Sequence, residues 1–142
     1  MSGWACVCLA QTQETRSVKI APQVEMHFRW ITPGSFLMGS PPDEEGRNDA
    51  EGPQHRVTLA RGFALGIHEV TVEQFARFVG EARFRTEADT VGSSRVYDER
   101  SGRIAERERI NWSHDYQGKT ALPNDPVLHV DWYDAQAYVE WL

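Results

Sequence analysis

Residues 131–142, DWYDAQAYVEWL, decide most about the fold, because they have the start and the periodicity of an amphipathic helix. Asp131 is placed to cap the first turn, and Asp134 follows three residues later as a second acceptor for unpaired N–H groups. Apolar residues then recur at steps of three and four, which predicts one buried stripe: Trp132, Ala135, Tyr138, Val139 and Leu142. No closing Gly, Asn or basic residue follows, so we expect the chain to be the front part of a larger domain, incomplete at its C-terminus.

A second helix is predicted over residues 71–82. Thr71 and Gln74 have the spacing of a capping box, in which each side chain bonds the other residue's main-chain N–H. Apolar residues at helical spacing predict its buried stripe: Val72, Phe75, Phe78, Val79 and Ala82.

Strands are expected in two consecutive pairs ahead of this helix. Residues 28–31 and 35–38 flank a Thr-Pro-Gly turn, whose fixed and permissive φ angles suit a β-hairpin. Residues 55–59 and 63–67 flank an Arg-Gly turn and predict a second hairpin.

The stretch between the two helices, residues 85–126, is the least regular part of the sequence. Its middle, residues 98–109, is densely charged and has few apolar anchors. Loops of this length inside a compact domain are often functional. Together these features predict an α+β fold with short antiparallel strands, two helices, long loops and little regular secondary structure.

Composition limits the classes of partner. The chain has 142 residues, of which 40% are hydrophobic and 25% charged, as in ordinary globular domains. Its formal net charge of −6 argues against a nucleic-acid partner, because phosphate binding needs a basic surface. No apolar run approaches the roughly 20 residues that a membrane-spanning helix needs.

Residues 1–27 are predicted to be an N-terminal tail or a residual export signal, with residues 11–27 as a linker or an irregular first strand. The apolar residues 4–10 are similar to the end of a signal peptide, although no basic segment precedes them. Cys6 and Cys8 lie in this tail, and no other cysteine supports a metal or redox pair. Localisation stays open: a cytoplasmic location is favoured, and a periplasmic or secreted one follows if residues 1–10 are a residual signal.

No complete catalytic, cofactor or metal constellation is recognisable from spacing alone. His68-Glu69 begins like an H-E-x-x-H zinc motif, but Val72 stands where the second histidine belongs. The acidic loop at residues 41–53 fails as an EF-hand, because Pro41 occupies the position of the first Asp. His129 precedes a helix cap, which favours a structural role.

Several stretches resemble the formylglycine-generating enzyme, or sulfatase-modifying factor, family. Asn111-Trp112 with His114 is similar to part of the long loop of these enzymes. Five other motifs occur in the family's order: ITPGSFLMGS at residues 31–40, GPQHRV at 52–57, EVT at 69–71 with Phe75, TEAD at 86–89, and PVLHVDWYDA at 126–135. The resemblance identifies residues 28–142 as the N-terminal part of such a domain.

The resemblance implies a C-type-lectin-like fold and a class of chemistry. The best-known members oxidise a cysteine in a sulfatase's C-x-P-x-R segment to formylglycine, using oxygen and a copper(I) ion held by two cysteines. Soft thiolates suit this role because they select Cu(I) over harder cations. In these enzymes the two cysteines and the calcium sites lie in the C-terminal half. The resemblance therefore implies no catalytic, copper or calcium residues within residues 1–142, and no activity of this chain alone.

The resemblance also carries over part of a substrate groove. Ala88 and Ser94 match an alanine and a serine that line it. A small residue leaves space for an extended peptide, and a hydroxyl can hydrogen-bond the peptide's main chain. Trp112 is a third candidate, either as a groove wall or as a core ring that anchors the loop. Plain loop packing remains the alternative for Ala88 and Ser94.

One departure weakens the inference that a sulfatase is the substrate. The family's sulfatase-modifying enzymes carry an additional tryptophan pair where this chain has Arg107-Glu108-Arg109-Ile110. The alternative function is a non-catalytic peptide- or ligand-binding module, since one scaffold hosts many functions. A related iron-dependent sulfoxide synthase is disfavoured, because no histidine cluster occurs. Expected partners are a sulfatase-type polypeptide and a second copy of the chain, bound through the apolar stripe of residues 131–142.

Overall fold

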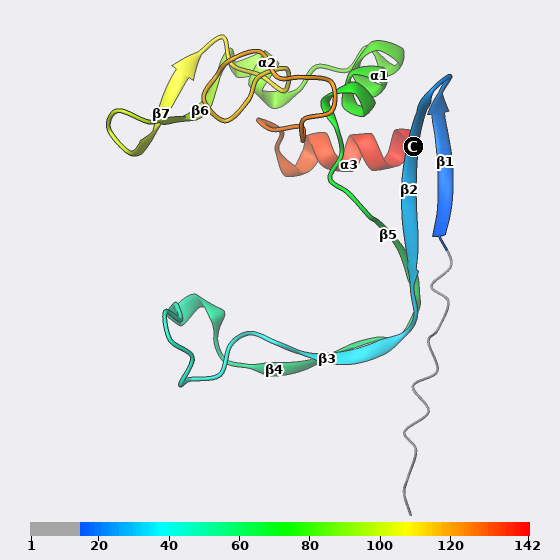
Figure 1. Cartoon of the computed structure of the whole chain (residues 1–142), viewed down its shortest axis with the longest axis vertical. Coiled ribbons are helices and arrows are strands. Elements are labelled where there is room, and N and C mark those ends of the chain that lie inside the picture. The colour runs from blue at the N-terminus through cyan, green and yellow to red at the C-terminus, as the bar shows by residue number, and fades with distance from the viewer. Residues whose placement is uncertain (1–14) are drawn as a thin grey trace, which may run out of the picture. The chain divides into compact units, whose positions relative to one another are not determined.

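The computed structural model describes residues 15–142, and Figure 1 shows its elements. The described residues fall into two compact units: residues 15–16 with 28–65, and residues 17–27 with 66–142. The elements along the chain are β1 (Thr15–Ala21), β2 (Val24–Ile31), β3 (Gly34–Met38), a 3-10 turn (Asp49–Glu51), β4 (His55–Leu59), β5 (Phe63–Gly66), α1 (Val72–Ala82), α2 (Glu87–Val91), β6 (Ser93–Asp98), β7 (Arg103–Glu108) and α3 (Trp132–Trp141). This is the α+β class that the sequence predicts, with three α-helices in place of two.

The predicted strand pairings are wrong, although the strand positions are nearly right. Residues 35–38 pair with β4 and not with residues 28–31, in an antiparallel register from Gly34 opposite Leu59 to Met38 opposite His55. The remaining strands of this region form a sheet in the order β1-β2-β5. The Pro-Gly turn does not reverse the chain, because Gly34 is itself the first residue of β3.

The acidic residues 41–53 form the connection that reverses the chain between β3 and β4 (Figure 1). Its base is closed by hydrogen bonds from Ser40 N to Glu51 O and from Gln54 Nε2 to Gly39 O, both 3.2 Å long. Asn48 caps the 3-10 turn by accepting a hydrogen bond from Ala50 N at 2.9 Å. The segment is thus an ordered hairpin loop that is stabilised by hydrogen bonds among its own residues and at its base.

The first regular elements begin earlier than predicted. β1 and most of the first half of β2 lie within residues 15–27, where the sequence predicts a linker or an irregular strand. Val24 and Met26 are buried, whereas the residues between and beside them on β2 are exposed. This alternation is what a half-buried strand requires. The cysteines Cys6 and Cys8 and the apolar residues 4–10 lie outside the described residues.

Helix α1 has the predicted cap and the predicted buried face. Thr71 Oγ1 accepts a hydrogen bond from Gln74 N at 3.3 Å, and Thr71 N donates to Gln74 Oε1 at 2.9 Å. Val72, Phe75 and Phe78 are buried, Val79 is half-buried and Ala82 is exposed. The capping box and the first three members of the apolar stripe are therefore as predicted, and the stripe is wrong at Ala82, in the last turn.

Helix α3 has the predicted cap but not the predicted buried stripe. Asp134 N donates to Asp131 Oδ1 at 2.8 Å, and Asp131 N donates to Asp134 Oδ2 at 3.0 Å. Trp132 is 70% exposed and Val139 is 69% exposed, while Asp134 and Tyr138 are both 3% exposed. The reason is that the second oxygen of Asp134 accepts a hydrogen bond from Glu87 N at 3.1 Å, which turns this polar residue inward.

An aromatic cluster forms the core of the second unit. Phe75 packs against Phe78, Trp112 and Tyr138 with ring centroids 5.3, 5.7 and 5.7 Å away. Tyr138 also lies 5.8 Å from Trp141, and its hydroxyl contacts Met26 Sδ at 2.9 Å. Burial raises the pKa of Tyr138 to about 12. These contacts connect α1, α3, β2 and the long loop through one set of rings.

The long stretch predicted to be irregular contains three regular elements. Thr86 caps α2, and its hydroxyl accepts a hydrogen bond from Asp89 N at 3.1 Å. The charged residues 98–109 form most of an antiparallel hairpin, in which β6 pairs with β7 from Ser93 opposite Glu108 to Asp98 opposite Arg103. Val96 and Ile110 supply the few buried apolar contacts of this hairpin. Within residues 15–142, no helix is both long enough and apolar enough to cross a membrane.

Candidate functional site

A cavity of about 310 Å3 brings two of the three sequence-predicted groove residues together. Ala88 from α2 and Ser94 from β6 both line it. The rest of its wall comes from the same two elements, from β7 and from the residues that precede α3: Glu87, Val91, Ser93, Arg95, Glu106, His129, Val130 and Asp131. The cavity lies entirely within the second unit and is the candidate functional site.

The N-terminal turn of α2 fixes the position of Ala88. Thr86 is fully buried, and its main-chain N–H and hydroxyl both donate to Asp89 Oδ2, at 3.3 and 2.9 Å. Asn111 Nδ2 donates to the other oxygen of Asp89 at 2.7 Å. Burial acts to raise the pKa of Asp89, but these hydrogen bonds outweigh it and lower the pKa. An ionised, fully bonded Asp89 therefore ties α2 to the long loop.

Asp134 supports the other side of the same turn, and its pKa is shifted in the opposite direction to that of Asp89. Its oxygens accept hydrogen bonds from Glu87 N and Asp131 N. Burial raises its pKa, and the neighbouring carboxylates of Asp131 and Asp89 add to that rise. Ala88 is thus presented by a short helix whose N-terminal turn is held by two carboxyl groups, the half-buried one of Asp89 and the buried one of Asp134.

Ser94 is paired with His129, which the sequence analysis assigns to a structural role. Ser94 Oγ lies 3.0 Å from His129 Nδ1, and His129 Nε2 lies 2.9 Å from the main-chain oxygen of Asp115. His129 has a φ of 57°, in the left-handed region that non-glycine residues rarely adopt. The one feature of the sequence that could have pointed to this contact is the position of His129, two residues before the Asp131 cap.

Trp112 does not line this cavity. Its ring is half-buried and packs 5.7 Å from the ring of Phe75. Its neighbour Asn111 is bonded to Asp89, so the segment 111–112 joins the core to α2. Of the three candidates, Ala88 and Ser94 line the same cavity and Trp112 does not.

The cavity wall carries more negative than positive charge. Glu87, Glu106 and Asp131 supply three carboxylates, against the guanidinium of Arg95. Glu106 Oε1 accepts a hydrogen bond from Ser93 Oγ at 2.6 Å, which fixes the orientation of that carboxylate. A wall of this kind favours a ligand with hydrogen-bond donors or a positive group.

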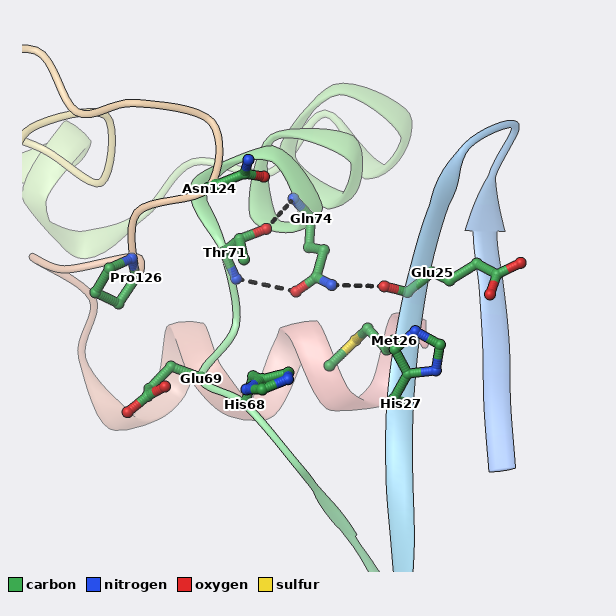
Figure 2. A pocket seen from close by; sticks show the side chains of 9 residues that line it. All are labelled: Glu25, Met26, His27, His68, Glu69, Thr71, Gln74, Asn124 and Pro126. Carbon is green, nitrogen blue, oxygen red and sulfur yellow. Dashed lines mark hydrogen bonds between the residues drawn. The ribbon is translucent and has the colours of Figure 1, made fainter. Parts of the chain in front are cut away.

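A second cavity, of about 350 Å3, lies between β2 and the start of α1 (Figure 2). The Gln74 side chain spans it by accepting from Thr71 N and donating to Glu25 O at 2.8 Å. His27 and His68 also line it, but the described residues 15–142 contain no group of three or more metal-binding side chains. Figure 2 shows the carboxylates of Glu25 and Glu69 extending to opposite sides, away from the two imidazole rings.

Comparisons with known proteins agree with this architecture. The chain is 33% identical over 132 residues to the formylglycine-generating enzyme of Mus musculus, covering 78% of this chain and 34% of that protein. It is 34% identical over 126 residues to the inactive C-alpha-formylglycine-generating enzyme 2 of Bos taurus, covering 76% of this chain and 41% of that protein. The chain thus spans well under half the length of these relatives.

A solved structure shares the fold. The structure of PvdO from Pseudomonas aeruginosa is similar with a TM-score of 0.58 and 26% identity, over 89% of this chain and 42% of that chain. The family model described as the sulfatase-modifying factor enzyme 1-like domain matches residues 14–142, which begin just before β1. The chain therefore belongs to the sulfatase-modifying factor (formylglycine-generating enzyme) family.

Proposed function

We propose that this chain supplies part of the peptide-binding groove of a formylglycine-generating-type oxidoreductase domain. The observation that carries the proposal is that Ala88 and Ser94 line one cavity. Ala88 leaves room for a peptide main chain, and Ser94 offers a hydroxyl to it. The carboxylates of the wall suit the arginine of a C-x-P-x-R segment, because opposite charges attract strongly at short range. In this proposal a sulfatase-type polypeptide is the substrate class.

Trp112 has an indirect role in this proposal. It holds the long loop on the core through Phe75, while Asn111 beside it holds Asp89 and hence α2. Replacing Trp112 would then weaken peptide binding by loosening α2. Its own contact with the peptide is not required.

The residues of the described segment do not fit a copper site of the family's kind. Cys6 and Cys8 are the only cysteines and lie outside the described residues, so residues 15–142 offer no thiolate. The same segment holds no cluster of three or more His, Cys, Asp or Glu residues for copper or calcium. We propose that the 142-residue chain alone does not oxidise cysteine.

Peptide binding tests the groove directly. A fluorescent C-x-P-x-R peptide is titrated with the 142-residue chain and with Ala88→Leu, which fills the cavity. We expect Ala88→Leu to weaken binding at least tenfold, because the added side chain occupies the peptide's space. Ala135→Leu, at an exposed position of α3, is the matched control and should bind normally. Equal binding by both variants would refute the groove.

The alternative is a binding module without catalysis. It is supported by the relative that is named an inactive enzyme, which is as similar to this chain as the active one. Oxygen uptake with copper(I) and the same peptide separates the two functions. Both are measured with the chain joined to the C-terminal part of a family member. A binding module should then bind the peptide without oxygen uptake, whereas an enzyme should bind the peptide and consume oxygen.

The proposed self-association surface is narrower than the predicted stripe. Tyr138 is buried, so Trp132, Ala135, Val139 and Leu142 remain as its exposed members. Sedimentation of the chain and of Trp132→Ser/Val139→Ser tests this surface. A concentration-dependent dimer that disappears in the variant supports it, and a dimer unaffected by both changes excludes it.

A further inference from the structure

We propose that His129 is a positioning residue that holds the Ser94 hydroxyl as a hydrogen-bond acceptor toward the cavity. The inference rests on the proposed function, in which the cavity takes an extended peptide. It adds that Ser94 recognises an N–H group of that peptide, and that His129 determines this polarity.

The hydrogen bonds around the imidazole specify its tautomer. The main-chain oxygen of Asp115 can only accept, and it also accepts from Gly118 N at 3.0 Å. His129 Nε2, 2.9 Å from the same oxygen, must therefore carry a hydrogen. In a neutral imidazole Nδ1 is then unprotonated and accepts a hydrogen bond.

Ser94 Oγ is the group that faces Nδ1, at 3.0 Å. A serine hydroxyl has one hydrogen and two lone pairs. Because that hydrogen is donated to Nδ1, only lone pairs remain for a ligand. Ser94 thus presents an acceptor to the cavity that it lines, and the matching ligand group is an N–H donor.

The surroundings hold His129 in this arrangement. The turn that presents Asp115 O is closed by Gln117 N and Lys119 N, each donating to Asp115 Oδ1 at 2.9 Å. Hydrogen bonding from Lys119 N, more than the opposing burial, lowers the pKa of Asp115. The positive φ of His129 is unfavourable for a non-glycine residue and persists only where neighbouring contacts fix it.

Protonation of the imidazole would reverse the polarity of the serine. Nδ1 would then donate to Ser94 Oγ, and the serine hydrogen would turn toward the cavity. A ligand N–H would meet a donor and bind less well. The charged groups that share this wall are Glu87 from α2, Arg95 from β6, Glu106 from β7, and Asp131 ahead of α3, with Asp115 behind the ring.

The first test needs no ligand. Nitrogen-15 NMR of the imidazole in the 142-residue chain should show an Nε2–H tautomer at about pH 8, where histidines are ordinarily neutral. Ser94→Ala should shift the Nδ1 resonance and leave Nε2 unchanged. An Nδ1–H tautomer, or an Nδ1 resonance insensitive to Ser94→Ala, would overturn the proposal whether or not any peptide binds.

The second test uses two matched ligands. The first is the C-x-P-x-R peptide, and the second is a set of its analogues, in each of which one main-chain amide is replaced by an ester that lacks the N–H. We expect one ester to bind about tenfold more weakly to the unaltered chain, the value of one hydrogen bond. Ser94→Ala should abolish that difference, and His129→Ala should reduce it, because the hydroxyl is then free to turn its hydrogen toward the ligand; the double variant should be no worse than Ser94→Ala.

His129→Asn is the conservative variant. Asn tolerates positive φ, and its side-chain oxygen can take the place of Nδ1 in accepting from Ser94. It should recover part of the discrimination between amide and ester that His129→Ala loses.

Different failures have different meanings. If His129→Ala weakens all peptides equally, its role is structural and the proposal is wrong. If no peptide binds the unaltered chain, the proposed function fails, and the NMR measurement still decides how His129 holds Ser94.

Discussion

The two compact units of this chain are stabilised in different ways. Every buried apolar residue of the described segment belongs to the second unit: Val24, Met26, Val72, Phe75, Phe78, Ala88, Val96, Ile110 and Tyr138. In the first unit the β3–β4 ribbon leaves Phe36, Leu37 and Met38 about half exposed. One unit therefore has a core of its own, and the other depends mainly on main-chain pairing.

This difference explains where the candidate site lies. Burial of aromatic rings contributes most of the favourable free energy of folding, at about 25 cal/mol per Å2 of apolar surface. Only such a core can keep Thr86 and Asp134 buried, and Asp89 half-buried, with their polar atoms hydrogen-bonded. The cavity of Ala88, Ser94 and His129 is built on this framework. The first unit offers no comparable support, and a two-stranded ribbon is marginally stable alone.

The largest test of the comparison replaces one phenylalanine in each unit. Phe78 is 1% exposed and Phe36 is 48% exposed. We expect Phe78→Ala to lower the free energy of unfolding by about 3–5 kcal/mol, because it opens a cavity among the rings. Phe36→Ala, the matched control, should lower the free energy of unfolding by no more than roughly 1 kcal/mol. Urea unfolding measures both, and equal losses would show that the units share one core.

A smaller effect is expected from adding a methyl group at Gly62. A Cβ there would lie 2.6 Å from the Trp30 ring and 2.8 Å from Ile31 O. We expect Gly62→Ala to destabilise the first unit by about 1–3 kcal/mol, since backbone and a packed ring must move. Hydrogen exchange of peptides within residues 28–65 would report it.

Gly80→Ala is the matched control for Gly62→Ala. Gly80 lies in α1 with open space around the added methyl group. We expect it to stabilise the second unit by about 0.5–1 kcal/mol, because alanine favours helix. If Gly62→Ala left exchange within residues 28–65 unchanged, the close contact with Trp30 would not be needed for that unit.

Two threonines test polar contacts in the same way. Thr71→Ala removes the cap of α1 and should cost about 1 kcal/mol. Thr58→Ala removes an exposed hydrogen bond to Ser35 Oγ, 2.8 Å long, and should change stability by less than about 0.5 kcal/mol. Thermal unfolding would rank them, and a larger effect at Thr58 would mean that the ribbon carries more stability than its exposure suggests.

The smallest expected effects are pH-dependent and have opposite signs at Asp89 and Asp134. The lowered pKa of Asp89 contributes stability that is present above the unfolded-state pKa and lost as pH falls through the folded-state pKa. The raised pKa of Asp134 contributes stability that is present below its unfolded-state pKa and lost as pH rises through its folded-state pKa. Both windows lie in the acid range, around the ordinary aspartate value.

Unfolding free energies at neutral and acid pH test these signs. Asp89→Asn should reduce the loss of stability on acidification, and Asp134→Asn should increase it. The comparison between the two pH values within each variant is the control, because it removes the constant cost of altering a cap. The same sign in both variants would contradict the assignment.

Local patterns in the sequence predicted the helices better than the strands. The capping boxes at Thr71 and Asp131 formed as expected, because they need only residues three positions apart. The pairing of β3 with β4 was missed, since it joins segments separated by the long acidic loop. The short helix α2 was also missed, although Thr86 and Asp89 have the capping-box spacing that could have revealed it.

The site was predicted in part for the same reason. Family resemblance supplied Ala88 and Ser94, which share the cavity, and Trp112, which lies elsewhere. The contacts of Ser94 with His129 and of Asp134 with Glu87 join residues far apart in the sequence. No periodicity or spacing encodes such contacts.

By itself the sequence determined the family, the α+β class, and the start of the two longer helices, because caps, apolar periodicity and family motifs are local properties. The tertiary structure alone decided which strands pair, which face of α3 is buried, and which residues line the cavity. Asp134 shows why: periodicity predicts that apolar Trp132 and Val139 should be buried, but the hydrogen bond from Glu87 N turns a carboxyl group inward. A partner supplied from another segment can outweigh the hydrophobic pattern of a helix.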